Sequence, residues 1–246
     1  MKNILSILII FILGISTIQA QSKADQILDK VDQNMSAKNQ VSVSEMVIHG
    51  QRRDRTISSK TYAVGSEKSF TEYLSPAREK GTKMLKLDDR LWIYSPTTDR
   101  TIQISGHMLR QSVMGSDLSY EDMMEDHKLT EIYSAKLLGE GTIGGRKGHH
   151  ISLTAKVVNV AYPIQKLWVD AERFVPLKQE LYAKSGKLLK RVTLSDVKKV
   201  DGRWYPMTIV YKDVLKSGDG TELKLQEVKF NQTIPAYIFT KAALKQ

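Results

Sequence analysis

The spacing of apolar residues along the chain changes from a helical period to a strand period near residue 40. Residues 22–35 predict an amphipathic helix, because apolar side chains recur there at intervals of three and four. The apolar positions are Ala24, Ile27, Leu28, Val31 and Met35. Ser22 and Asp25 resemble a capping box at the start of this helix. The helix therefore has one apolar face that must be buried.

From residue 41 onward, apolar and polar residues alternate in short segments separated by turn residues, which predicts antiparallel β structure. The segments are 41–50, 54–64, 69–74, 82–87, 90–96, 101–105, 131–139, 148–155, 165–170, 174–183, 187–197, 203–214 and 221–230. Residues 184–186, 200–203 and 216–221 read as hairpin turns. We expect roughly ten or eleven strands in hairpin order.

A sheet of this size curls, and the alternation gives it one apolar and one polar face. In residues 187–197, Leu188, Val192 and Leu194 are expected to point inward, with Lys190 on the same side. The apolar face needs a cover. The available helical segments are 22–35, the segment 105–126, and a short C-terminal helix within 236–245. The predicted fold is therefore mainly β with helices, a single curved antiparallel sheet with helices in its concave face.

Residues 105–126 interrupt the strand pattern and hold half of the methionines expected after removal of residues 1–20. Ser119 and Asp122 are expected to cap a short helix there, with Leu118 and Met123 at the staple positions. Methionine is flexible and polarisable, so it adapts to irregular apolar shapes. We interpret the segment as a lid that rests on the sheet and repacks around an acyl chain. Its ligand-binding residues are Met108, Leu109, Val113, Met114, Leu118, Met123 and Met124. The alternative is that they are ordinary core.

Other residues near this segment admit two readings. Trp92 and Tyr94 share one side of their strand and are expected to line the ligand cavity, unless they are plain core. Arg110 either contacts a lipid headgroup or caps a helix. The carboxylates of the segment lack the spacing of a calcium loop and are expected to form a solvated helix face. They are Asp117, Glu121, Asp122, Glu125 and Asp126.

The first residues have the layout of a cleaved secretory signal. An apolar run at residues 4–18 follows Lys2, and Ala20 offers a small residue before the cut. A membrane anchor is the alternative, but the run is short and interrupted. We expect a signal peptide at 1–20, a single domain at 21–246 and a periplasmic location in a Gram-negative cell envelope.

The composition narrows the chemistry. The chain has no cysteine, so disulfides and thiolate sites are excluded. Its net charge is +10. Because export makes nucleic acid an unexpected partner, an anionic membrane surface or lipid is the better candidate, unless the lysines only keep strand edges soluble. The adjacent His149 and His150 point to opposite faces of a strand, and no nucleophile–base arrangement is apparent. We expect no metal, no cofactor and no enzymatic activity.

Two stretches resemble the LolA-like outer-membrane lipoprotein-sorting protein family, in a broad branch rather than the housekeeping lipoprotein carrier. Residues 87–123 hold the W-x-Y-x-P strand end at Trp92 and the M-G-S-D-x-S-Y-E-D run at Met114. Residues 166–213 hold W-V-D-x-x-x-x-x-P-L-K and D-G-R-W-x-P. The resemblance implies an unclosed, strongly curved antiparallel half-barrel with helices in its mouth. It also implies a periplasmic carrier for lipoprotein or lipid acyl chains.

These observations predict a monomeric carrier that takes its cargo from an inner-membrane donor complex and passes it to an outer-membrane acceptor. An alternative is a periplasmic sensor or adaptor of the same fold that recognises a lipid or peptide for a membrane partner. An esterase is the third and least favoured reading.

Overall fold

The computed structural model describes residues 22–50, 52–125 and 127–246. The predicted signal peptide lies outside the described residues. The strands form one antiparallel sheet in the order β6-β5-β4-β3-β2-β1-β13-β12-β11-β10-β9-β8-β7. The strands are β1 (Asn39–Ile48), β2 (Arg55–Val64), β3 (Lys68–Ser75), β4 (Lys83–Leu87), β5 (Arg90–Ser95), β6 (Arg100–Ile104), β7 (Tyr133–Ile143), β8 (Arg146–Ala155), β9 (Ile164–Asp170), β10 (Pro176–Tyr182), β11 (Leu188–Val200), β12 (Arg203–Asp213) and β13 (Thr221–Phe230). The prediction of a single curved antiparallel sheet is confirmed, whereas ten or eleven strands was an underestimate.

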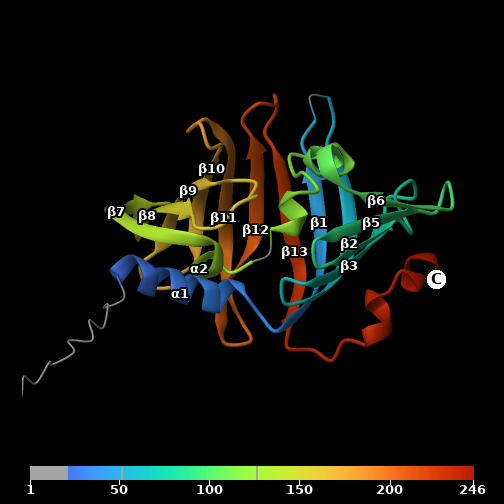
Figure 1. Ribbon diagram of the computed structural model, residues 1–246, viewed down its shortest axis with the longest axis horizontal. Helices are drawn as coiled ribbons and strands as arrows, with labels where there is room; N and C mark the ends of the chain where they lie inside the picture. The colour runs from blue at the N-terminus through green and yellow to red at the C-terminus, as the bar shows by residue number, and fades with distance from the viewer. Residues whose placement is uncertain (1–21, 51, 126) are drawn as a thin grey trace, which may run out of the picture.

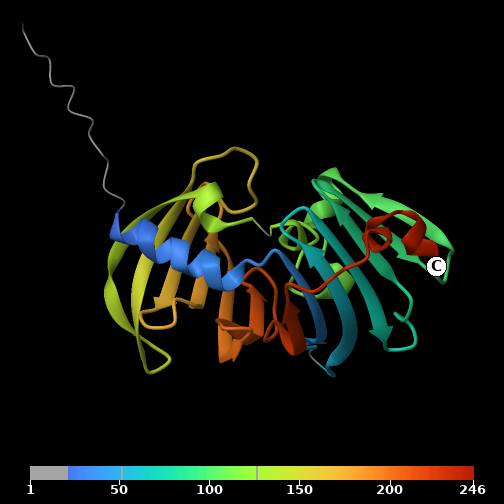
Figure 2. The ribbon, with the colours of Figure 1, turned by 90° about the horizontal axis from the view of Figure 1, so that it is seen from below.

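The order of the strands places the chain's first and last strands side by side. β1 pairs with β13, so the sheet is continuous through its middle. Its two edges are β6 and β7, which follow each other in the chain. The sheet bends into an open trough, and the segment between β6 and β7 lies inside it (Figures 1 and 2). The fold is therefore an unclosed half-barrel whose two free edges are joined by one connection.

The N-terminal helix forms as predicted. α1 (Lys23–Met35) is capped by Ser22, whose Oγ accepts a hydrogen bond from the Asp25 N–H at 3.1 Å. Its apolar face packs on the inner side of β7, β8 and β9, in a core cluster that includes Leu28, Val31 and Ile151. Asp32, also buried, accepts hydrogen bonds from the N–H groups of Leu129 and Thr130 at 2.9 and 3.0 Å. This carboxylate caps α2 (Leu129–Ile132) and ties it to α1.

The C-terminal residues lie on the opposite face of the sheet. They form two short 3-10 helices, η4 (Ala236–Phe239) and η5 (Ala242–Lys245), instead of the single helix expected. Ala243 and Leu244 pack against Phe70, Leu85 and Trp92. Because Leu91 joins the cluster on the inner face, its neighbour Trp92 must point outward. The C-terminal segment therefore covers the outer side of β3, β4 and β5.

Candidate ligand-binding cavity beneath the β6–β7 connection

The connection between β6 and β7 is a compact coil of short helices. It contains η1 (Gly106–Arg110), η2 (Val113–Gly115), η3 (Asp122–Met124) and then α2. Backbone hydrogen bonds hold the coil together. The Val113 N–H donates to the Leu118 carbonyl at 2.8 Å, and the Glu121 N–H donates to the Leu109 carbonyl at 2.7 Å. We call residues 105–125 of this connection the lid segment. The reciprocal hydrogen bonds expected between Ser119 and Asp122 are present, but they close the turn before η3 and do not cap it, because the N-cap residue of this single 3-10 turn is Glu121.

The lid segment packs its apolar side chains onto the inner face of β1 to β5. Leu118 belongs to a cluster with Met46, Ile57, Tyr73 and Leu91. Six of the seven lid residues predicted to bind ligand lie in or against this cluster: Met108, Leu109, Met114, Leu118, Met123 and Met124. Val113 is buried as well, at 1% exposure. The sequence therefore correctly grouped these residues on one apolar surface against the sheet.

Two predicted residues lie elsewhere. The structure does not bring Trp92 and Tyr94 to the lid segment, because they pack with the C-terminal residues on the outer face. Alternation along β5 gives Leu91 and Ile93 to the lid instead. The sequence could not choose between the faces, since both are apolar. Arg110 is exposed at the end of η1 and caps no helix through its side chain in the described residues.

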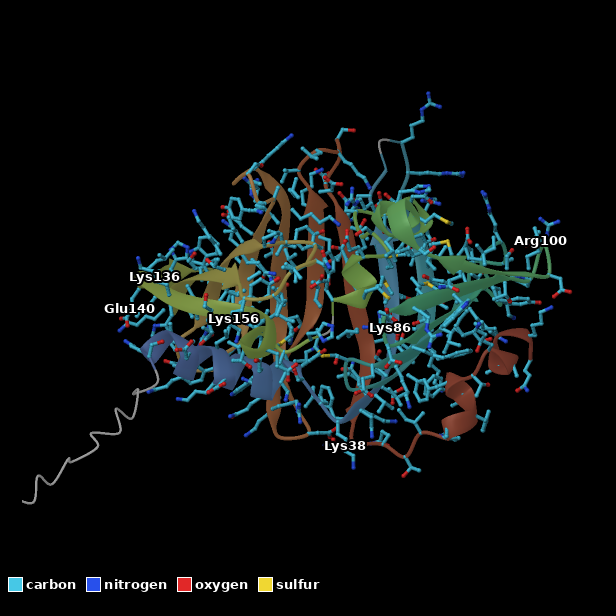
Figure 3. All side chains as sticks on the ribbon, viewed as in Figure 1. Lys38, Lys86, Arg100, Lys136, Glu140 and Lys156 are labelled. Atoms are coloured by element: carbon cyan, nitrogen blue, oxygen red, sulfur yellow. The ribbon has the colours of Figure 1, made fainter. Side chains whose placement is uncertain are left out.

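The lid segment is held from both halves of the sheet by buried lysines. Lys190 of β11 forms an ion pair with Asp122, with the two side chains 9% and 7% exposed. The Tyr162 hydroxyl donates to the other carboxylate oxygen of Asp122 at 2.6 Å. From the other half, Lys86 of β4 donates to the Met124 carbonyl at 2.8 Å and is 2% exposed (Figure 3). η3 is thus fixed at both of its ends.

The carboxylates of the lid segment do not form the solvated face that the sequence predicted. Asp122 is buried in its ion pair. Asp117 is also buried; it accepts hydrogen bonds from the Asp213 N–H at 2.9 Å and the Thr221 hydroxyl at 3.1 Å. The prediction was wrong for both residues because their partners are distant in the chain. Asp126 lies outside the described residues.

Burial also changes the acidity of groups around η3. Burial raises the pKa of Glu125, and the hydrogen bond that it accepts from the Ala161 N–H opposes this only in part. The pKa of Tyr162 is raised strongly, first by burial and then by the nearby Asp122 carboxylate. The Tyr162 hydroxyl is therefore a stable donor to Asp122.

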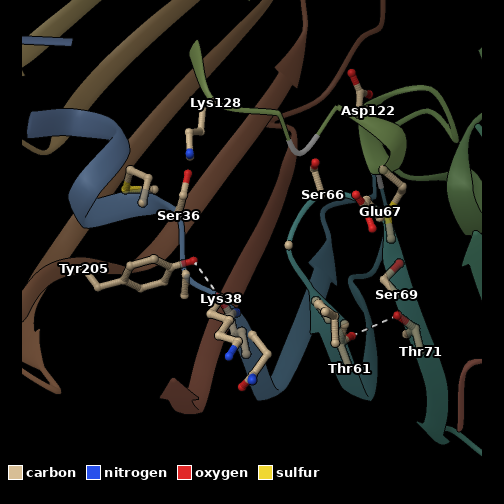
Figure 4. A pocket seen from close by; sticks show the side chains of 18 of the residues that line it. Ser36, Lys38, Thr61, Ser66, Glu67, Ser69, Thr71, Asp122, Lys128 and Tyr205 are labelled. Carbon is tan, nitrogen blue, oxygen red and sulfur yellow. Dashed lines mark hydrogen bonds between the residues drawn. The ribbon is translucent and has the colours of Figure 1, made fainter. Parts of the chain in front are cut away.

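Beside the lid segment lies a cavity of about 770 Å³, between the end of α1, the β2–β3 hairpin and the inner faces of β12 and β13 (Figure 4). Its volume is within the range of small-molecule sites. Leu118 and Met123 of the lid segment form one wall, and Tyr211 and Leu223 form part of another. Any movement of the lid segment would therefore change the size of this cavity.

The floor of the cavity is polar, whereas the sequence predicted a concave face that is apolar apart from Lys190. The hydroxyls of Thr61 and Thr71 hydrogen-bond across β2 and β3 at 2.9 Å, and Ser69 lies beside them (Figure 4). Next to this floor, the Ser44 and Ser59 hydroxyls pair at 3.2 Å. Small polar residues at alternate positions of adjacent strands were the signal in the sequence that would have revealed this floor. Lys38, Lys128 and Arg203 also line the cavity, together with Glu67 and Glu131.

A second cavity of about 550 Å³ lies on the other side of the lid segment, where Leu109 and Met124 meet the β8–β9 loop at Val157 and Val158. Carboxylates surround it: Glu67, Asp88, Asp89, Glu121 and Glu125. In the residues that the structure describes, no group of three or more metal-ligating side chains is found. His150 stacks on Trp168, with ring centroids 4.2 Å apart, while His149 lies 3.4 Å from a Glu140 oxygen. The two histidines thus face different neighbours.

Among the described residues, no helix has the length and apolar character required to cross a bilayer.

Comparisons with known proteins agree on the fold. A family model described only as an uncharacterized protein matches residues 65–246. No curated protein matches the chain. Among solved structures, a LolA superfamily protein from Nitrosomonas europaea is 27% identical, with a TM-score of 0.73, over 91% of this chain and 100% of that one.

Two further structures are similar over nearly their whole length. A DUF1329 family protein from Desulfovibrio piger is 25% identical, with a TM-score of 0.81, over 89% of this chain and 96% of that one. A domain described as an outer-membrane lipoprotein-sorting protein, from Vibrio parahaemolyticus, is 24% identical, with a TM-score of 0.80, over 91% of this chain and 99% of that one. Together with the open half-barrel, these matches confirm the resemblance seen in the motifs. The chain belongs to the family whose model matches residues 65–246, and its fold and sequence similarity are those of the LolA superfamily.

Proposed function

We propose that this protein is a periplasmic, non-enzymatic carrier that holds the acyl chain of a lipid or lipoprotein between the lid segment and the sheet and delivers it toward the outer membrane. The observation that carries the proposal is the arrangement of Leu118 and Met123. Both pack in the apolar cluster under the lid segment and also form a wall of the 770 Å³ cavity. An acyl chain in this cavity therefore lies against the apolar side chains of the lid segment.

The energetics fit a carrier. Each buried methylene contributes about 0.8 kcal/mol, so a long acyl chain is held firmly once it replaces the methionines. Methionine side chains repack at low cost, because they are unbranched. The polar floor and the charged side chains of the cavity suit the polar end of an amphiphile rather than a second acyl chain. We therefore expect one chain under the lid segment, with the polar end of the cargo on the hydroxyl floor.

Native mass spectrometry of protein isolated from its host envelope tests this proposal directly. The expected spectrum contains a non-covalent lipid adduct that is lost on organic extraction and restored by added lipid. Protein that carries no lipid and accepts none would contradict a carrier function and would favour the sensor or adaptor reading.

Substitution of the cavity wall provides the matched test. Met123→Asp places a carboxylate where the chain would lie, so binding of a fluorescent fatty acid is expected to weaken by about 10-fold or more, equal to about 1.4 kcal/mol. The control is Leu138→Asp on the edge strand β7, which makes a similar exchange at a half-exposed site away from the cavity. Equal affinities of the two variants would argue against the proposed position of the chain.

A further inference from the structure

One end of the half-barrel carries a concentration of positive charge on the tips of adjacent hairpins. The β1–β2 turn holds the exposed Arg52 and Arg53, with Arg55 at the start of β2. The β10–β11 turn holds Lys184 and Lys187, and the β12–β13 turn holds Lys216. We call these six side chains the cationic rim. The three hairpin tips point in the same direction from the sheet (Figure 1).

The three tips form one continuous edge. The His49 N–H, at the end of β1, donates to the Gly220 carbonyl at 3.2 Å, which joins the first tip to the β12–β13 turn. The Val214 N–H donates to the Leu189 carbonyl at 3.0 Å, which joins that turn to the start of β11. The rim cations therefore lie along a single edge and not on separate surfaces.

The carboxylates near the rim do not cancel this charge. Asp54 is occupied by His49 Nδ1 at 2.9 Å and by the Gly50 N–H at 3.3 Å. Asp213 accepts from the Leu215 N–H at 2.9 Å and lies 4.0 Å from Lys216 Nζ, so it offsets one rim cation in part, and Asp219 is exposed. The rim thus holds six cations, whereas only three carboxylates lie in the same turns or at their borders.

The hairpin turns at the opposite ends of the same central strands differ in composition. The β2–β3 turn holds Glu67 and the β11–β12 turn holds Asp201, and the cations there, Lys68 and Arg203, begin the strands that follow. The rim is therefore distinguished by cations in the turns themselves, where they project furthest from the sheet.

An apolar side chain projects from the same edge. Leu215 is 61% exposed at the tip of the β12–β13 turn, directly before Lys216. Cations on hairpin tips can make separate contacts with a flat charged surface, whereas a stable complex with a folded acidic protein buries an extended face on each partner. An exposed leucine beside lysines and arginines suits the boundary between headgroups and acyl chains of a bilayer.

We infer that the cationic rim is a docking surface for an anionic lipid bilayer, on which the protein stands with its hairpin tips in the headgroup region. This inference goes beyond the proposed carrier function, because it names the surface by which the protein meets a membrane. The cavity does not enter it.

Co-sedimentation of residues 22–246, which contain every described element of the fold, tests the inference. The vesicles are phosphatidylcholine with phosphatidylglycerol, compared with pure phosphatidylcholine. Binding is expected only to the anionic vesicles and is expected to weaken as salt rises. Each cation near such a surface contributes about a 5-fold factor, so Lys184→Glu/Lys187→Glu is expected to reduce binding by about 25-fold or more.

The control is Lys136→Glu/Lys147→Glu, which changes the net charge equally at exposed positions on β7 and β8, the two strands at one edge of the sheet, neither of which forms a rim hairpin; Lys136 is labelled in Figure 3. It is expected to bind nearly as well as the wild type. An equal loss in both double variants, or no binding of the wild type to anionic vesicles, would overturn the inference.

Leu215→Ser separates a bilayer from a soluble polyanion. The substitution is expected to weaken binding to vesicles and to leave binding to polyglutamate unchanged. If the wild type prefers polyglutamate, and Leu215→Ser affects neither partner, the rim recognises an acidic polypeptide and the inference is wrong. Uptake of a fluorescent fatty acid by Lys184→Glu/Lys187→Glu is expected to remain normal, so a failure at the rim is distinguishable from a failure of the carrier function.

Discussion

Two lysines that a typical protein would leave in water are instead buried beneath the lid segment. Lys86 and Lys190 lie in different halves of the sheet, yet both bind η3. A buried ammonium group is costly unless it is paired. Lys190 gains the Asp122 carboxylate, and Lys86 gains a backbone carbonyl at the end of η3, where helix carbonyls lack partners within the helix. The two lysines therefore hold η3 from opposite halves of the sheet.

The Lys190–Asp122 pair is expected to behave as a coupled unit. Lys190→Met alone leaves the Asp122 carboxylate buried without its cation and is expected to cost about 3 kcal/mol or more of unfolding free energy. Asp122→Leu/Lys190→Met replaces both charges and is expected to recover most of this loss, less the hydrogen bond of Tyr162. Urea unfolding of the wild type, both single variants and the double variant measures the coupling. Additive losses would show that the pair makes no energetic contribution in the folded protein.

Glu125 is expected to make the stability of the lid segment depend on pH. Burial raises its pKa in the folded protein, so the folded state binds a proton more tightly than the unfolded state. Its contribution to stability is therefore complete below the unfolded pKa and is lost as the pH rises through the folded value. Glu125→Gln keeps an acceptor for the Ala161 N–H but cannot ionise.

The measurement is the urea midpoint at a series of pH values from below the ordinary glutamate pKa up to neutrality. The variant is expected to gain stability relative to the wild type as the pH increases. Parallel curves for the two proteins would show that Glu125 ionises without a cost in the fold.

At the scale of elements, the C-terminal segment makes a testable contribution to the outer face. Leu244 is fully buried against Phe70, Leu85 and Trp92. Leu244→Ala is expected to cost about 2–5 kcal/mol and to alter the fluorescence of Trp92. Tyr237→Ala, at a side chain 63% exposed in η4, is the control and is expected to change stability little. The measurement is the thermal unfolding midpoint of each variant. Equal midpoints for the two variants would contradict the packing of Leu244 on the outer face.

The helix and the strands followed from the sequence because their periodicity reports burial directly. α1 begins at the predicted cap, and each alternating segment became a strand with bounds within a few residues of those expected. The lid segment was harder to predict. Its apolar residues have no regular period, so the sequence correctly marked it as a non-strand element but expected a helix where the chain forms separate 3-10 turns.

The sequence predicted the candidate site only where the residue type alone indicated the role of a side chain, without knowledge of its partners. Methionines concentrated in one segment indicated an adaptable apolar surface, and they do lie together. Asp122 and Lys190 are 68 positions apart, so nothing local showed that the aspartate would be buried. Trp92 was placed on the wrong side for a similar reason, since the segment that covers it comes from the end of the chain.

At the scale of the whole molecule, the topology explains why a single connection can serve as a lid. The free edges β6 and β7 are neighbours in sequence but lie at opposite ends of the sheet. The chain must cross the open side of the trough to join them, and the lid segment lies on this path (Figure 2). Movement of the connection therefore alters the cavity without breaking a strand pair.

Two cations of the rim donate hydrogen bonds to the lid segment, which links membrane docking at the rim to the position of the lid segment. Arg55 Nη2 donates to the Met114 carbonyl at 2.7 Å. Lys216 Nζ donates to the Ser112 hydroxyl at 2.5 Å and to the Ser116 carbonyl at 2.7 Å. Phosphate oxygens are stronger acceptors for these cations than neutral carbonyl groups are. A membrane that engages the rim therefore competes for the donors that hold the turn at residues 112–116.

Docking on anionic vesicles is accordingly expected to loosen this turn. The N–H groups of Val113 and Ser116, which are hydrogen-bonded within the lid segment, are expected to exchange with deuterium faster when the protein is bound to vesicles that contain phosphatidylglycerol than when it is free beside pure phosphatidylcholine vesicles. The expected increase is up to about 10-fold, for a loss of about 1.4 kcal/mol of local stability. Lys184→Glu/Lys187→Glu is the matched control, since these lysines belong to the rim but lie in the β10–β11 turn, outside the segment whose exchange is measured. If exchange at Val113 and Ser116 stays unchanged while the wild type is bound to vesicles, docking and opening are independent, and release of cargo requires a protein acceptor.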